Sequence, residues 1–129
     1  MISILSAVLL AAAGQVPIGP CRVVDGDTLR CGGERVRLLG IDAPEKGRCQ
    51  PGRRCARGDP HASEASLARA AQGPLTIRRV SQDRYGRTIG LVAGRAGDLS
   101  CHQLRSRQAI YRADWDNGGR LAAFCRAAR

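Results

Sequence analysis

Four carboxylates lie close together in a chain whose charge is otherwise positive. Asp25 and Asp27 flank a glycine in VVDGDTL, and Asp42 and Glu45 follow in GIDAPE. Clustered carboxylates repel one another, because each disfavours the ionisation of its neighbour. A hard divalent cation such as Ca²⁺ or Mg²⁺ relieves this repulsion and prefers oxygen ligands. We therefore expect Asp27 and Asp42 to hold a metal ion, although Asp-Gly pairs also serve simply as hairpin turns.

Two arginines accompany these acids. Arg37 lies on an expected strand five residues before Asp42, and Arg87 closes the turn DRYGR. A strand arginine between apolar residues can also be a solvated residue on the outer face of a sheet. With a metal ion, however, two guanidinium groups form a set for phosphodiester hydrolysis, because both stabilise charge on phosphoryl oxygens. Glu45 would orient or deprotonate the attacking water.

The overall composition favours a phosphate-bearing partner. The 129 residues include 21 Lys and Arg against 11 Asp and Glu, a net charge of +10, and Lys46 is the only lysine. Guanidinium groups match phosphate oxygens and stay charged. The 43% of hydrophobic residues exclude a disordered chain, whereas the 3% of aromatic residues predict an aliphatic core and weak stacking on bases. The length fits one domain.

The N-terminal segment predicts export. Residues 1–13 are almost entirely apolar and end in three alanines, as a signal-peptidase site requires. The segment is shorter than the roughly 20 residues that span a bilayer as a helix. We expect a cleaved signal peptide and a secreted or periplasmic protein without stable membrane association. An uncleaved anchor or a misplaced start codon are the alternatives.

The cysteines also indicate an oxidising compartment, because an even number in a small exported chain is typical of disulfides. The first two flank an Asp-Gly-Asp turn and face each other in the hairpin register that this turn sets. The next two close a short loop, which leaves the last two for each other. A zinc site is the competing interpretation, but no Cys-x-x-Cys pair occurs. The expected disulfides are Cys21–Cys31, Cys49–Cys55 and Cys101–Cys125.

Short strands and interspersed helices must position these groups. Alternating polarity predicts strands, and an Asp59-Pro60 cap opens a helix that Gly73-Pro74 ends. Together they predict an α+β fold around a small barrel. The expected elements are a hairpin over 21–31, strands over 34–41, 75–80 and 88–93, and helices over 60–71, 100–107 and 119–126.

Three sequence blocks resemble the staphylococcal-nuclease-like (thermonuclease) family. They are VVDGDTL at 23–29, RLLGIDAPE at 37–45 and DRYGR at 83–87, in an order and spacing specific to that family. The resemblance covers about residues 21–126. It implies an OB-type five-stranded β-barrel with about three α-helices, and a Ca²⁺-dependent phosphodiesterase of DNA and RNA.

The resemblance also implies roles for individual residues. Asp27 and Asp42 would be calcium ligands, with the backbone carbonyl of Ala43 as a third. Ala43 stands where the family often has threonine, a change that a carbonyl ligand tolerates.

The remaining roles concern the substrate. Arg37 and Arg87 would clamp the phosphate and Glu45 would be the general base. Arg84 and Tyr85 of the DRYGR turn would contact the nucleic acid.

This chain departs from the family in the segment GRCQPGRRCARG, which replaces a loop that is commonly mobile. We expect the Cys49–Cys55 bridge to restrain this loop and to hold Arg53 and Arg54 as a rim for the nucleic-acid backbone. Arg107 stands where the family frequently has glycine, so it would adopt a left-handed conformation unless the helix ends differently.

Aromatic and histidine residues outside the three blocks have simpler expected roles. Tyr111 is a candidate for stacking on a base, and Trp115 for a core or cap anchor. His61 and His102 are expected at the surface or at helix caps.

Two other functions compete with a monomeric nuclease. A noncatalytic nucleic-acid-binding OB-type module would need no general base, so the presence of Glu45 argues against it. A cationic protein that acts on membranes would carry its arginines on amphipathic helices, whereas here they concentrate in loops and strand ends.

Overall fold

The structure is a computed structural model that describes residues 14–129. The expected signal peptide, residues 1–13, lies outside the described residues. Within residues 14–129, none of the helices combines the length and the apolar character needed to cross a bilayer.

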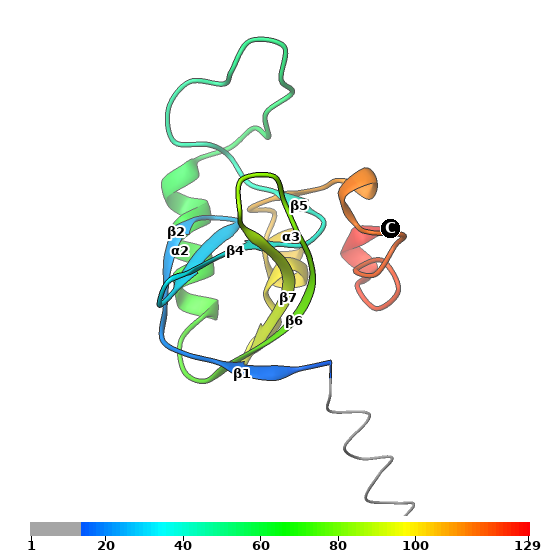
Figure 1. The fold of residues 1–129 in the computed structure, drawn as a ribbon. Helices are drawn as coiled ribbons and strands as arrows, with labels where there is room; N and C mark the ends of the chain where they lie inside the picture. The colour runs from blue at the N-terminus through cyan, green and yellow to red at the C-terminus, as the bar shows by residue number, and fades with distance from the viewer. Residues whose placement is uncertain (1–13) are drawn as a thin grey trace, which may run out of the picture.

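A curled mixed sheet forms the centre of the α+β fold, with the helix α2 (Pro60–Ala70) along one side (Figure 1). The hairpin of β2 (Cys21–Asp25) and β3 (Thr28–Cys31) has the predicted register, with Cys21 opposite Cys31 and Val23 opposite Leu29. β4 (Glu34–Leu38) pairs antiparallel with β3 on one side and parallel with β7 (Thr88–Gly94) on the other. In order across the sheet, the strands are β1 (Val16–Ile18), β6 (Leu75–Gln82), β7 (Thr88–Gly94), β4 (Glu34–Leu38), β3 (Thr28–Cys31) and β2 (Cys21–Asp25), with β8 (Gly97–Asp98) beside β7.

Two helices begin at aspartate caps. Asp59 accepts a hydrogen bond from the backbone N–H of His61 and opens α2 (Pro60–Ala70), close to the predicted helix. Asp98 caps α3 (Leu99–Arg105) by accepting from the N–H of Cys101. Burial raises the pKa of Asp98 to about 6. Both helices pack on an aliphatic core, as the scarcity of aromatic residues predicts; its fully buried side chains include Leu29, Leu38, Ile41, Leu67, Ile77, Leu99 and Leu121.

The predicted third helix over 119–126 is wrong. The chain there forms hydrogen-bonded turns, followed by the 3₁₀ helix η2 (Arg126–Ala128). Asp116 is fully buried, and its carboxylate accepts hydrogen bonds from the backbone N–H groups of Leu121 (2.6 Å) and Ala122 (3.0 Å). The preceding residues 117–119 all have positive φ, which an α-helix does not allow.

The sequence pattern did not predict four short strands. The predicted strand over 34–41 divides at Gly40, whose φ of 79° ends β4 and lets the chain turn into β5 (Ile41–Asp42). β5 pairs with β9 (Ile110–Tyr111) as a separate two-stranded sheet. β1 and β8 are equally short, and two or three residues are too few to show an alternating pattern.

All three disulfides form between the predicted partners, and no cysteine of the described chain is free. Cys101–Cys125 joins α3 to the C-terminal turns, and Cys49–Cys55 closes a loop that projects from the top of the molecule in Figure 1. After α3 ends, Arg107 has a φ of 56°, so of the two expected alternatives the left-handed conformation occurs.

The side chain of Glu34 in β4 links three strands by hydrogen bonds. Its carboxylate accepts two hydrogen bonds from Arg79 of β6, at 2.8 and 2.7 Å, and one from the Thr88 hydroxyl of β7, at 2.7 Å. The Arg79 hydrogen bonds, aided by Thr88, lower the pKa of Glu34 to about 2 from its ordinary 4.5. A lowered carboxylate pKa adds stability above the ordinary value, and this stability is lost as the pH falls toward the lowered one.

We predict that Glu34→Gln lowers the free energy of unfolding at pH 7 by about 1 kcal/mol, because charged hydrogen bonds become neutral ones. The difference from the unsubstituted protein should shrink below about pH 4.5, as titration of Glu34 in the unfolded chain predicts. Urea denaturation from pH 7 to pH 3 measures it. Asp114→Asn is the control, since Asp114 forms no ion pair in the described chain, and a pH-independent Glu34→Gln effect would contradict the prediction.

Candidate functional site

The predicted site residues converge on one cavity of about 790 Å³. They reach it from the β2–β3 turn, β4, the segment after β5 and the turn between β6 and β7. Those that line it are Asp27, Arg37, Ala43, Glu45, Arg53, Arg84, Tyr85 and Arg87. Asp42 lies just behind this wall, and Arg54 does not line the cavity.

Backbone and side-chain hydrogen bonds place the two aspartates side by side. Asp27, only 5% exposed, accepts from the Thr28 hydroxyl at 2.8 Å and from the backbone N–H of Ala43 at 2.9 Å. The hairpin tip is therefore tied directly to the GIDAPE segment, as the sequence predicted. Arg37 spans both acids, with Nη1 3.4 Å from Asp27 Oδ2 and Nη2 3.7 Å from Asp42 Oδ1.

A close approach of α2 supports the hairpin tip from behind. Gly26 lies so near this helix that an added Cβ would come within 1.8 Å of Ser63 Oγ and 2.9 Å of Ala43 Cβ. The buried Gln103 amide also donates to the carbonyls of Gly26 (2.8 Å) and Ser63 (2.9 Å). Glycine is thus required here by space, and the contact fixes the turn that carries Asp27.

Asp42 is a fully buried carboxylate surrounded by guanidinium groups. Arg112 donates from Nη2 (3.0 Å) and Nε (3.3 Å) to Oδ2, and Arg53 Nη2 lies 3.6 Å from Oδ1. These cations and Arg37 compensate the charge, which burial alone would make costly. Oδ1 nevertheless lacks a hydrogen-bond partner within the described chain.

The donor set suits a hard cation. The described residues contain no cluster of three Asp, Glu, His or Cys side chains that could hold a metal. Asp27, Asp42 and the Ala43 carbonyl nevertheless offer the oxygen ligands that Ca²⁺ prefers, and Asp42 Oδ1 is unpartnered. Burial, followed by the nearby Asp27 charge, raises the pKa of Asp25.

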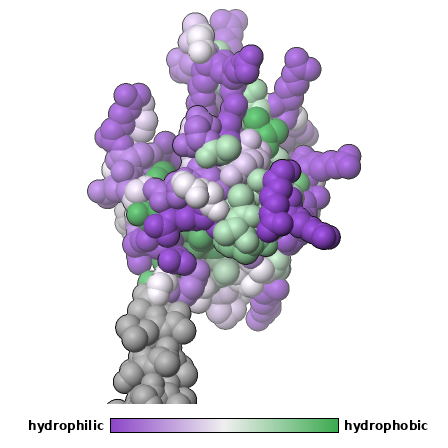
Figure 2. Space-filling view, turned by 90° about the vertical axis from the view of Figure 1, so that its right-hand side faces the viewer, coloured by the Kyte–Doolittle hydropathy of each residue, from purple (hydrophilic) through white to green (hydrophobic). Residues whose placement is uncertain are grey.

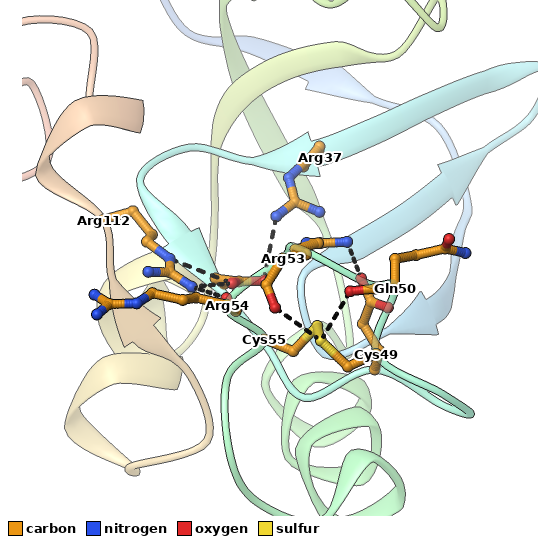
Figure 3. The surroundings of a disulfide bond; sticks show 9 residues. Arg37, Cys49, Gln50, Arg53, Arg54, Cys55 and Arg112 are labelled. Carbon is orange, nitrogen blue, oxygen red and sulfur yellow. Dashed lines mark hydrogen bonds and ion pairs between the residues drawn. A yellow bond between two sulfur atoms is a disulfide. The ribbon is translucent and has the colours of Figure 1, made fainter.

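Glu45 lines the cavity, but it is paired with an arginine of the disulfide-closed loop. Arg53 Nη1 donates to Glu45 Oε1 while Nη2 approaches Asp42. Figure 3 shows Arg53 beside the disulfide with Arg37 above it. Arg53 therefore lies inside the site, whereas the side chain of Arg54 extends away from Arg37 (Figure 3).

Arg87 is positioned by a residue of its own turn. Asp83 accepts from Arg87 Nε at 2.7 Å and from the backbone N–H of Tyr85 at 2.9 Å. Although burial opposes it, these hydrogen bonds lower the pKa of Asp83. The Tyr85 ring, 59% exposed, lies 5.0 Å from Arg84 Cζ and 5.6 Å from Arg87 Cζ. An exposed ring and two arginines thus stand together at the cavity.

Two important neighbours of the site were not predicted as such. Arg112 follows the two-residue strand β9, and nothing in its local sequence distinguishes it from the other arginines. Trp115 was predicted as a core or cap anchor, but it lines the cavity, 37% exposed, in the 3₁₀ helix η1 (Ala113–Trp115). Its ring lies 5.1 Å from Arg37 Cζ and 5.4 Å from Arg112 Cζ, within cation–π range.

Three other candidates lie away from the cavity. Tyr111 donates to Asp116 at 2.5 Å, and this hydrogen bond raises the pKa of Tyr111 to about 12. Its hydroxyl therefore stabilises the C-terminal turns through Asp116. His61 contributes its backbone N–H to the α2 cap, and the His102 ring contacts Ser66 Oγ at 3.1 Å.

The outer surface is strongly hydrophilic. Figure 2 shows long hydrophilic side chains projecting around a smaller apolar area on the face that it views. With a net charge of +10, this surface attracts polyanions.

The chain is similar to known proteins. A family model described as Staphylococcal nuclease homologue matches residues 35–122, which include Arg37, Glu45 and Arg87. The succinoglycan biosynthesis protein ExoI of Rhizobium meliloti (strain 1021) is 35% identical over 136 residues. That alignment covers 98% of this chain and 70% of the relative.

The cavity should bind phosphate groups, and Trp115 should report it. Trp115 is the only tryptophan of the chain and lies next to Arg37, so pyrophosphate binding should change its fluorescence. We predict that Arg87→Gln weakens pyrophosphate binding about tenfold, because a charge-assisted hydrogen bond is lost. Arg30→Gln removes the same charge from an exposed position outside the cavity and should have little effect. Equal weakening by both substitutions would show that only net charge matters.

Proposed function

The chain belongs to the staphylococcal nuclease homologue family, and on this premise we propose that it is a Ca²⁺-dependent phosphodiesterase that hydrolyses DNA, RNA or both. One observation supports this proposal most strongly. A carboxylate, Glu45, and two arginines, Arg37 and Arg87, line the same cavity as Asp27, with the buried Asp42 beside Arg37. We also infer that the curled sheet is the OB-type barrel of this family.

Asp27, Asp42 and the backbone carbonyl of Ala43 would hold Ca²⁺. When bound, the ion would supply electrostatic stabilisation of charge on the phosphoryl oxygens. The orientation of the ligands is built into the fold, because the Ala43 N–H binds Asp27 and the β5–β9 pair fixes the backbone of Asp42.

The arginines and Glu45 act on the substrate. Arg37 and Arg87 donate hydrogen bonds to the scissile phosphate and stabilise negative charge as it builds in the transition state. Glu45 accepts a proton from the attacking water as the water oxygen bonds to phosphorus. The bond from phosphorus to the leaving oxygen breaks, and this oxygen takes its proton from solvent. Asp83 is a positioning residue, because it holds the guanidinium of Arg87.

The flanking nucleic acid would lie across the arginine-rich surface. Arg84 and Tyr85 contact it at the cavity mouth, and Arg53 and Arg54 of the disulfide-closed loop contact its backbone. Contacts of this kind recognise phosphates and sugars, so we expect little sequence preference. Binding should weaken steeply with salt, because each neutralised phosphate releases counterions.

We further infer an extracytoplasmic monomer. All six cysteines are paired in disulfides, which persist in oxidising compartments and are rare in the cytosol. The predicted signal peptide is consistent with secretion or a periplasmic location.

Replacing the general base tests the proposal. We predict that Glu45→Gln lowers kcat about 100-fold or more on plasmid DNA, single-stranded DNA or RNA, because proton acceptance by the carboxylate is lost. EDTA should abolish hydrolysis, and added Ca²⁺ should restore it. Glu64→Gln is the matched control, since Glu64 pairs with Lys46 and does not line the cavity.

The same assay identifies the alternative. Tight binding of DNA and RNA that remain intact with Ca²⁺ would instead establish a noncatalytic nucleic-acid-binding module. If hydrolysis is undiminished in EDTA, the proposed dependence on Ca²⁺ is wrong.

A further inference from the structure

The loop between β5 and α2 places a cation where the proposed metal ion would bind. Arg53 approaches Asp42 Oδ1 at 3.6 Å through Nη2 and donates to Glu45 through Nη1. One guanidinium therefore neutralises both a proposed calcium ligand and the proposed general base. The Asp42 oxygen that it approaches is the buried one without a hydrogen-bond partner.

Arg53 differs from the other two arginines around Asp42. Arg112 forms two hydrogen bonds to Asp42 Oδ2 and another to the backbone carbonyl of Arg54, so it is firmly held. Arg37 also approaches Asp42 without a hydrogen bond, but its side chain extends from β4, is only 14% exposed and pairs with Asp27 as well. Arg53 lies on a loop with its side chain 37% exposed, and its 3.6 Å approach to Asp42 forms no hydrogen bond. Of the three, Arg53 can leave Asp42 with the least disturbance of the fold.

The Cys49–Cys55 disulfide keeps Arg53 in this position. The two cysteines close a loop of six residue steps, and a turn within it joins the Arg53 N–H to the Gln50 carbonyl at 3.1 Å. Cys49 Sγ also lies 3.2 Å from the carbonyl oxygen of Arg53 (Figure 3). A closed loop has few conformations, so the backbone of Arg53 stays near the cavity even when its side chain moves.

We propose that Arg53 is a built-in competitor of the divalent cation. In the metal-free protein, it neutralises Glu45 and Asp42, and a cation that binds at Asp42 must displace it. The displaced guanidinium remains at the cavity because the loop is closed. There it can contact the nucleic-acid backbone, the role that the sequence predicted for Arg53. This inference rests on the proposed calcium site. It also explains how the buried negative charge of Asp42 is compensated before a metal ion binds.

Calcium binding in the absence of any nucleic acid tests the proposal. Isothermal titration calorimetry with CaCl₂ should show that Arg53→Gln binds Ca²⁺ about tenfold more tightly than the unsubstituted chain, because no ion pair has to break. Arg48→Gln is the matched control, since it removes the same charge from the same loop without a contact to the acids. Its affinity should change less than about twofold, because exposed distant charges are screened by salt.

A second substitution tests the role of the bridge. In Cys49→Ser/Cys55→Ser, the freed loop should hold Arg53 at the cavity less often, so Ca²⁺ binding should again become tighter than in the unsubstituted chain. Adding Arg53→Gln to this double variant should produce little further gain, because both changes remove the same competitor.

The outcomes separate this inference from the proposed function. If Asp42→Asn abolishes Ca²⁺ binding but Arg53→Gln and Arg48→Gln bind with equal affinity, the competitor is disproved and the calcium site stands. If the unsubstituted chain and Arg53→Gln both bind no Ca²⁺, the calcium site fails and the inference fails with it. Tighter binding in Arg53→Gln that Asp42→Asn abolishes supports both.

Discussion

The burial of Asp42 is the constraint on which the site depends. A carboxylate without solvent needs compensating charge, and removing one partner of a buried ion pair commonly costs about 3–5 kcal/mol. Here the compensation comes from β4 (Arg37), the disulfide-closed loop (Arg53) and the segment after β9 (Arg112). The ion pairs of Asp42 thus join three segments that are far apart in the sequence. The same segments form three sides of the proposed active site.

The elements around Asp42 serve this requirement as well as the main core, to which Ile41 and Leu121 belong. β5 and β9 are only two residues long, yet their pairing fixes the backbone on both sides of the ion pairs. Asp116 then organises the C-terminal turns, and these place Trp115 against Arg37 and Arg112. Because the guanidinium groups of Arg37 and Arg112 each contact both an acid and the Trp115 ring, these planar groups have little freedom to rotate. Such restraint favours recognition of a phosphate with a defined orientation.

The sequence predicted the parts of this protein that depend on local rules. Hairpin register placed Cys21 opposite Cys31, and clustering of acids anticipated the contact between the Asp27 turn and the segment of Ala43. Tertiary contacts decided the rest. Positive φ at residues 117–119 replaces the start of the predicted third helix with turns, and Arg112 becomes important only because β9 pairs with β5. Arg53 was predicted at a rim, but the acids inside the cavity attract it because their charge is poorly solvated.

The tight contact behind the hairpin tip has a consequence for how this domain can vary. Gly26 has no room for a side chain, so even alanine at this position would push the turn away from α2. The displacement would move Asp27 without altering any charged group, and it would also strain the buried amide of Gln103. Adding one methyl group at position 26 would therefore impair function without preventing folding. The disulfides would still form and the core would still pack, but Asp27 would lose its position in the cavity. In a mutational survey, position 26 should then rank with the charged residues themselves.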